Sequence, residues 1–308
     1  MTDERDVDLE AEKEALQALI WRGDEPLEPV LDRAMRVVVA ASRPEHANHP
    51  MRPCVHEDLL LVHQMMDFPG YAAKIERIAA TFAAEIPTSS QCHACMAFLA
   101  VQALIEQGRL DEAELAANRA TVELPRDDSF ATECRRLDLV TALCEVAYKR
   151  GDAAAIRARL PAFAKYKTVL SMFNATLAAW AALCELFIAD LEDDVHAAAS
   201  RFAEVIELTE LAQDVGLRAA RALARLYTRA GQWARARELA ERAAEAARGR
   251  DALRFHAELR IVAIEACREL GALDEAAGHA RTLSDVVPRL KTRDLDERAR
   301  TLAQELGA

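Results

Sequence analysis

The sequence predicts an all-α protein built from antiparallel helical hairpins, and three observations support this fold class. Alanine and leucine dominate the apolar residues, aromatic residues make up only 5% of the chain, and the abundant Ala, Leu, Glu and Arg are strong helix formers. Stretches in which β-branched or aromatic residues alternate with polar ones are absent, so strands are not expected. Apolar residues recur instead at helical spacing, in blocks that single glycines separate.

The clearest hairpin occupies residues 216–247, and the rest of the chain varies its pattern. The apolar face of its first helix consists of Leu217, Ala220, Leu223, Ala224 and Tyr227. After an interruption at Gly231, the pattern resumes on a second helix at Trp233, Ala236, Ala240, Ala243 and Ala247. A glycine between two such helices is typical of a helical hairpin.

The N-terminal part follows this pattern less closely. Residues 9–21 and 26–41 predict a degenerate first hairpin around Gly23. Residues 42–55 contain three prolines and two histidines, so we expect an irregular loop there. Residues 59–66 then restart a helix.

Residues that interrupt the helical pattern recur at regular intervals and indicate a repeat. From Gly108 onward they recur about every 40 residues, at Gly108, Gly151, the acidic corner 192–194, Gly231 and Gly271. Alanines stand five and nine positions after three of these glycines, at Ala113 and Ala117, Ala236 and Ala240, and Ala276 and Ala280. A proline stands 17 positions after Gly70, Gly108 and Gly271, at Pro87, Pro125 and Pro288. We expect the glycine to end a first helix in a left-handed turn, the alanines to let the second helix pack closely and the proline to end it.

This pattern resembles the tetratricopeptide repeat family. Leu223, Ala224 and Tyr227 match the leucine, glycine and spaced tyrosine of the family's first-helix motif, and Ala236 matches its second-helix alanine. The three prolines have a counterpart in the family's terminal proline.

The chain also departs from the family. Ala220 and Ala240 stand where the family has tryptophan and a bulky aromatic residue, and the spacing exceeds the usual repeat of about 34 residues. Such longer, alanine-rich hairpins are similar to the helical repeat regions of bacterial signal-transduction regulators. The resemblance covers about residues 56–290, and it implies a right-handed superhelical solenoid with a concave face lined by first helices.

The C-terminal residues predict a capping helix. Its apolar face consists of Leu295, Ala299, Leu302 and Leu306, and its other face is charged, as the end of a solenoid requires. We therefore divide the chain into an N-terminal hairpin and loop at residues 1–55, helical repeats at residues 56–290 and a cap at residues 291–308.

Composition and motifs exclude several classes of protein. The formal net charge of −12 argues against non-specific nucleic-acid binding. No apolar run approaches a membrane span, and the acidic start lacks the parts of a signal peptide, so we expect a cytoplasmic protein without membrane partners. The glycine-rich phosphate loop and the common hydrolase and metalloprotease motifs are absent, so we predict that the chain is not an enzyme.

Arginines define a first candidate site. Arg218, Arg221, Arg225 and Arg229 follow one face of a first helix, directly after a hairpin that is strongly acidic. The resemblance places this face at the family's ligand-contacting positions in the concave groove, where arginine would hold carboxylates or phosphates. The competing interpretation is a solvated face whose arginines pair with acidic residues of the preceding helix, namely Glu204, Glu207 and Glu210.

Cysteines and histidines define a second candidate site. Cys54 and His56 begin one first helix, and Cys92 and Cys95 begin the next, so the four side chains could converge on one tetrahedral zinc ion. The competing interpretation, which we favour, is buried cysteine beside loop histidine, with no cofactor.

Three functions remain open. We favour a non-catalytic scaffold that binds an acidic protein or peptide partner in its concave groove, in bacterial regulation or complex assembly. The first alternative is a regulator that senses a small anionic or nucleotide ligand there. The second is a nucleic-acid-associated protein that uses the basic block Arg218–Arg254, which the net charge disfavours. Assembly into a homo-oligomer is left open.

Overall fold

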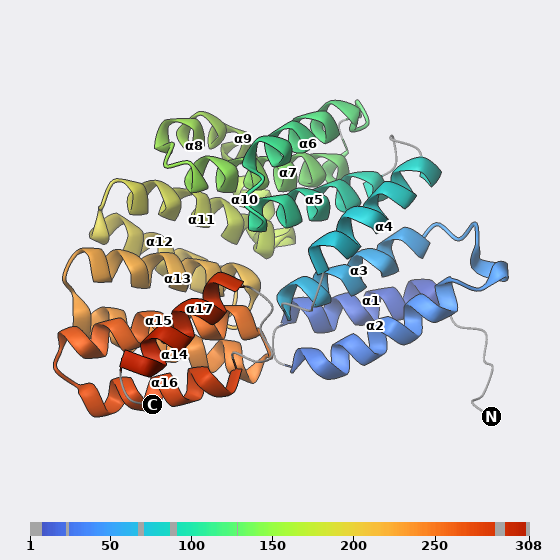
Figure 1. Ribbon diagram of the computed structural model, residues 1–308. Coiled ribbons are helices and arrows are strands. Elements are labelled where there is room, and N and C mark those ends of the chain that lie inside the picture. The colour runs from blue at the N-terminus through green and yellow to red at the C-terminus, as the bar shows by residue number, and fades with distance from the viewer. Residues whose placement is uncertain are drawn as a thin grey trace, which may run out of the picture.

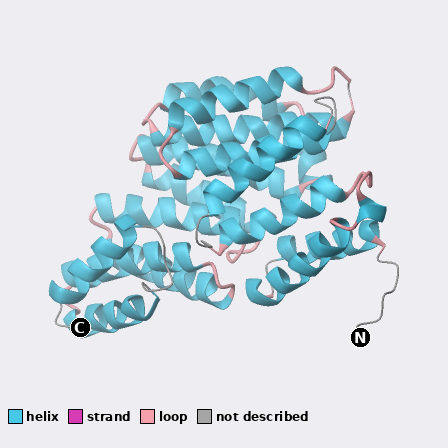
Figure 2. Cartoon of the chain, turned by 45° about the vertical axis from the view of Figure 1, so that its right-hand side comes forward, coloured by secondary structure: helices cyan, strands magenta, loops and turns pink. Residues whose placement is uncertain are grey.

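The computed structural model describes residues 8–22, 25–66, 71–86, 91–127, 129–286 and 293–305. All regular structure in these residues is helical, which confirms the predicted all-α class (Figure 2). None of the helices in this part of the chain is both long and apolar enough to cross a membrane.

The described helices form seven successive hairpins and a final helix (Figure 1). The first helices of the hairpins are α1 (Leu9–Arg22), α3 (Arg52–Met65), α5 (Gln91–Glu106), α7 (Phe130–Lys149), α11 (Ala175–Leu191), α13 (Asp214–Arg229) and α15 (Leu253–Glu269). The second helices are α2 (Leu27–Ala41), α4 (Tyr71–Glu85), α6 (Leu110–Glu123), α12 (Val195–Leu208), α14 (Trp233–Gly249) and α16 (Leu273–Val286). In the fourth hairpin the second helix is replaced by the short helices α8 (Ala153–Arg159), α9 (Pro161–Ala164) and α10 (Lys167–Phe173), and α17 (Arg293–Glu305) ends the array.

The helices form two layers along an arc. Each first helix packs on the first helix of the next hairpin, and each second helix packs between its own first helix and the following one. The extensive contacts among the described helices therefore join hairpins that are neighbours in sequence, as in a repeat protein. Figure 1 shows the arc from α1 and α2 at one end to α13–α17 at the other.

The backbone confirms the predicted left-handed turns at the ends of first helices. Gly108, Gly151, Gly231 and Gly271 each end a first helix with a positive φ between 68° and 75°, which glycine adopts without steric cost. The acidic corner does the same at Asp193, with φ of 54°. All six alanines at the repeated offsets are buried, so the second helices approach the first ones closely there.

The N-terminal region corrects one expectation. Within residues 42–55 only a short 3₁₀ helix (Pro44–His46) and turns precede α3, which already begins at Arg52. Pro53 lies in the first turn of α3, where a backbone N–H has no partner inside the helix, so this proline starts the helix rather than breaking it.

Several predicted features lie outside the described residues. These are Gly23, Gly70, Pro87, Pro288 and Leu306, and the side chains of Leu295 and Ala299. Of the predicted capping face, Leu302 is described, and it is buried in a cluster with Leu253 and Leu283.

Arg250 joins the two ends of the arc. This arginine lies between α14 and α15, is 1% exposed, and donates hydrogen bonds to the carbonyl oxygens of Ile20 and Glu25, 225 or more residues away. Its own carbonyl oxygen accepts a hydrogen bond of 3.1 Å from the N–H of Leu27. Ile20 lies in the last turn of α1 and Leu27 begins α2, so one residue satisfies open backbone groups at both helix ends.

We expect Ala236→Leu to lower the free energy of unfolding by about 1–3 kcal/mol. Ala236 is a completely buried residue of α14, and the larger side chain overpacks the hairpin. Urea denaturation measures the change. Ala234→Leu, at an exposed position of the same helix, is the control and should unfold like the wild type. Equal stability of both variants would contradict the close approach of α13 and α14.

We expect Arg250→Ala to lower the free energy of unfolding by about 2 kcal/mol, because the carbonyl oxygens of Ile20 in α1 and of Glu25 before α2 lose their donor. Arg248→Ala is the matched control, since this side chain is 64% exposed and pairs only locally with Glu245. A wild-type urea midpoint for Arg250→Ala would show that the contact does not hold the ends together.

Candidate functional site

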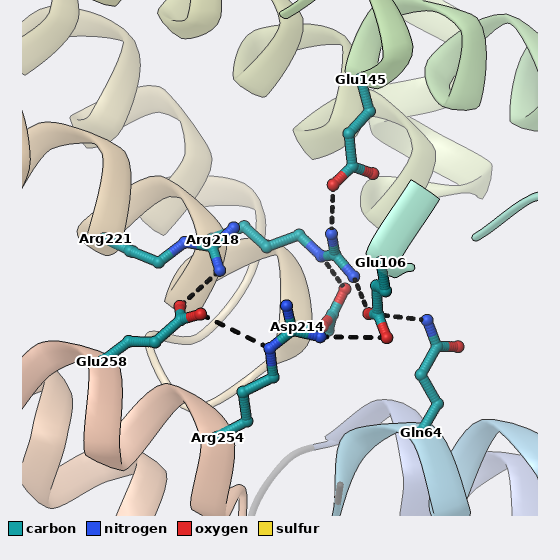
Figure 3. Close-up of polar contacts among 8 residues, drawn as sticks. All are labelled: Gln64, Glu106, Glu145, Asp214, Arg218, Arg221, Arg254 and Glu258. Carbon is teal, nitrogen blue, oxygen red and sulfur yellow. Dashed lines mark hydrogen bonds and ion pairs between the residues drawn. The ribbon is translucent and has the colours of Figure 1, made fainter. Parts of the chain in front are cut away.

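Arg218 is the centre of a polar network on the inner face of the arc (Figure 3). Its Nε donates to Asp214 Oδ2 at 2.7 Å, and its Nη1 donates to Glu145 Oε1 on α7 at 2.6 Å. Its Nη2 lies 3.7 Å from Glu106 Oε1 on α5. The guanidinium also stands over the ring of Trp180 at 5.4 Å. Only 5% of Arg218 is exposed, so this cation is buried and fully surrounded by partners.

The network continues through a second carboxylate. Arg221 Nη1 donates to Glu258 Oε2 at 2.5 Å, and Arg254 Nε donates to Glu258 Oε1 at 3.4 Å. Arg254 also lies 3.1 Å from Glu106 Oε2. The other carboxylate oxygen of Glu106, Oε1, accepts a hydrogen bond from Gln64 of α3. Side chains from α3, α5, α7, α13 and α15 thus meet at one place on the inner face.

The carboxylates of the network differ in their proton affinity. Burial raises the pKa of Glu258, but Arg221 and Arg254 outweigh burial and lower it to about 2. Burial is likewise outweighed at Glu145, chiefly by Arg218, so the pKa of Glu145 is below its ordinary value. Burial holds the pKa of Glu106 above its ordinary value despite Arg254 and Arg218. Glu258 and Glu145 are therefore charged partners of the arginines at neutral pH.

The other two arginines of the predicted stripe lie at the edge of this network. Arg229 donates to the backbone oxygen and to Oδ1 of Asp190 at 2.8 Å, and lies 3.2 Å from Asp193. Arg225 is exposed. Arg218 and Arg221 are thus buried in the network, while Arg225 and Arg229 are exposed at its edge.

The partners of the stripe differ from those we expected. Glu204, Glu207 and Glu210 on the preceding helix are not the partners of Arg218 and Arg221. Besides Asp214 on its own helix, Arg218 pairs with Glu145, 73 residues away on α7, and with Glu106 on α5, and Arg221 pairs with Glu258 on α15. Glu204 pairs with Arg201 at 2.6 Å. A sequence signal for the true partners exists, because Glu145 interrupts an apolar run of a first helix and Glu106 ends one, where a charge needs a buried partner.

The cysteine and histidine residues converge only in part. Cys54 Sγ and Cys92 Sγ lie 3.1 Å apart, as the hairpin register predicts. The imidazole of His56 packs 5.1 Å from the ring of Phe82 instead, and burial together with Arg52 and Lys74 lowers its pKa to about 4. Cys95 hydrogen-bonds Glu57, and burial raises the pKa of its thiol. Two of the four expected zinc ligands are thus brought together.

A different trio, Glu241, Cys267 and His279, places its potential ligand atoms within 4.8 Å of one another. His279 Nε2 lies 3.0 Å from Glu241 Oε1, but its Nδ1 faces Arg260 Nη1 at 2.9 Å. Arginine only donates, so Nδ1 accepts and Nε2 carries the proton that bonds Glu241. This arrangement already satisfies the imidazole, and a nearby guanidinium repels a cation.

An open cleft of about 1040 Å³ lies on the outer side of the array, over α11 and between α8–α10 and α12. Its floor is one face of α11, formed by Ala178, Ala181, Ala182, Glu185, Ile188 and Ala189. Leu160, Phe163 and Leu170 line the side formed by α8–α10. The cleft exists because these short helices do not continue the layer of second helices.

The described charged residues that line the cleft, which stand at its rim except for Glu185 on the floor, carry an excess of negative charge. Five carboxylates, Glu185, Glu192, Asp194, Glu204 and Glu207, face two arginines, Arg157 and Arg201. Arg201 lies between Glu185 at 2.7 Å and Glu204 at 2.6 Å, and Arg157 pairs with Glu192. The acidic block that the sequence shows before the arginine stripe therefore borders this cleft.

The fold has a solved counterpart. The crystal structure of a tetratricopeptide repeat protein from Parabacteroides merdae matches 97% of this chain and 99% of its own, with a TM-score of 0.52 and 14% sequence identity. The chain therefore has a tetratricopeptide-repeat-like, all-α fold, as the spacing of its glycines, alanines and prolines predicts. Its sequence matches no protein-family model, and comparison with curated proteins gives no match. The fold therefore has the architecture of a helical-repeat protein.

We expect Glu258→Gln to lower the free energy of unfolding at pH 7 by about 3 kcal/mol, because Arg221 and Arg254 lose a buried anion. Glu258 has a lower pKa in the folded protein, about 2, than its ordinary value of 4.5. Its contribution is therefore complete above pH 4.5 and is lost as the pH falls toward 2.

Urea denaturation of wild type and variant at several pH values measures this difference, which should shrink below pH 4.5. Glu238→Gln, an exposed glutamate of α14, should show a small and constant difference. A difference for Glu258→Gln that is independent of pH in this range would contradict the ion pairs.

Proposed function

We propose that this chain is a non-catalytic helical-repeat scaffold that binds a segment of a partner protein in the cleft over α11. The single observation that carries the proposal is the cleft itself, an open and largely apolar depression of about 1040 Å³ where the layer of second helices is interrupted. Concave, mostly apolar depressions of this order of volume are typical of binding sites.

The lining of the cleft suits a polypeptide better than a small ligand. Small-molecule sites combine an enclosed apolar pocket with a few convergent polar groups. Here the floor consists of four alanines, Ile188 and Glu185, which is already paired with Arg201. The other charged groups lie at the rim, where Arg157 pairs with Glu192. A chain segment can cover such a floor with its own side chains while its polar groups stay near the rim.

The concave face supports the alternatives less well. Its described cavities near Arg218 measure about 50 Å³ and 20 Å³, which is room for a few water molecules. An acidic partner or a small anion at the arginine stripe would have to displace Glu145 from Arg218 and Glu258 from Arg221. Arg229 is paired with Asp190 and Asp193, and the chain carries a net charge of −12, which disfavours nucleic acid.

We expect a partner to be crosslinked in the host when a photoreactive amino acid replaces Glu207 at the rim, and not when it replaces the exposed Glu238 on α14. Ala181→Trp fills the floor of the cleft and should abolish this crosslink. The exposed Ala234→Trp is the control for folding and added surface, and should leave it intact. Mass spectrometry identifies the crosslinked segment.

Crosslinking that is equal at both positions, or that persists in Ala181→Trp, would contradict the proposal. Circular dichroism and the urea midpoint of Ala181→Trp establish that the variant remains folded, so that a lost crosslink reports on the cleft.

A further inference from the structure

The shape of the cleft indicates the form of its occupant. In neighbouring hairpins this place over a first helix is taken by a second helix of 14 or 17 residues, such as α12 or α14. Over α11 the corresponding chain is divided into helices of 7, 4 and 7 residues, which stand to one side of the cleft. The molecule therefore leaves a space of helical dimensions in its outer layer.

The floor of the cleft is complementary to a helix. Its α11 residues follow a spacing of three and four from Ala178 to Ala189, so they form a straight stripe about 17 Å long, or about three helical turns. Alanines along this stripe let the axis of a second helix approach to about 8–10 Å. Ile188 and, from the opposite side, Phe163 offer apolar contacts to larger side chains.

The charges of the cleft indicate the chemistry of its occupant. Arg157 stands on the side of α8, whereas Asp194, Glu204 and Glu207 stand on the side of α12. Arg201 compensates for only part of this charge, since it is shared between Glu185 and Glu204. Glu207 is exposed and has no ion-pair partner among the residues that the structure describes. A cation on this side gains attraction, and an anion is repelled.

We propose that the cleft binds an amphipathic α-helix of a partner protein, with its apolar face on the alanine floor of α11 and a basic flank against α12. The inference rests on the proposed function and specifies the partner. The apolar face gives affinity by removing the floor from water, and the basic flank fixes the orientation of the helix between a largely acidic and a largely apolar wall.

The probe for this proposal is a synthetic amphipathic peptide of about 18 residues, with leucine and alanine on one face and lysine and arginine along one flank. Fluorescence anisotropy with the full chain should show saturable binding that weakens as salt is added. Circular dichroism should show that the peptide gains helix on binding. A peptide with glutamate at the basic positions should bind about tenfold more weakly or worse, and so should one with a central proline.

Variants of the protein locate the binding. Ala181→Trp should abolish it, while Ala234→Trp should not. Glu207→Lys should lower the affinity for the basic peptide about three- to tenfold and raise the affinity for the glutamate peptide. The matched Glu238→Lys should change neither affinity. Equal binding of both peptides, equal binding of the proline peptide or indifference to Ala181→Trp would each overturn the inference.

The outcomes separate this inference from the proposed function. A cleft-specific crosslink to an acidic or extended segment would overturn the basic helix and leave the scaffold function standing. Absence of any cleft-specific crosslink would overturn both. Sedimentation of the protein alone tests a second copy as occupant: self-association that Ala181→Trp abolishes would overturn a separate partner.

Discussion

The burial of Arg218 is the constraint on which the rest of the structure depends. A guanidinium that is removed from water needs anions close to it. Here α7 and α13 supply hydrogen-bonded carboxylates, and α5 supplies Glu106 at 3.7 Å. These three helices belong to different hairpins, so their relative positions are fixed by a single charge. The curvature of the arc follows, because Glu106 and Arg254 can meet only if α5 and α15 turn toward each other. Arg250 completes this closure at the ends of α1 and α2.

Closure of the arc fills the inner face with paired side chains. In an open array of hairpins the first helices present a groove to a partner. Here the inner side chains bind one another, and the described space left near Arg218 holds little more than water. The larger depression lies on the outer face, where three short helices replace one long helix. The same chain thus retains a repeat architecture while a large, mostly apolar cleft lies over α11 in the layer of second helices.

Helix α11 connects these two regions. On its inner side Trp180 lies beneath the guanidinium of Arg218, and Asp190 accepts hydrogen bonds from Tyr148 and Arg229. On its outer side Ala181 and Ala182 form the floor of the cleft. A helix that docks in the cleft would rest on an element which the buried ion pairs hold in place. Such a preformed floor reduces the conformational entropy that binding costs.

The sequence by itself determined the helices, the turns between them and the close packing within each hairpin. These features depend on neighbours in the chain: Gly231 adopts its positive φ locally, and Ala236 is small wherever its hairpin is placed. The hairpin register also sufficed to bring Cys54 near Cys92, because adjacent hairpins pack in sequence order. The stripe from Arg218 to Arg229 was visible too, but its partners were not. Glu145 lies 73 residues from Arg218, and only the curvature of the whole array brings them within 2.6 Å. The tertiary structure likewise decided which face of α11 remains uncovered, since that depends on where α8–α10 turn in space and not on the periodicity of α11 itself.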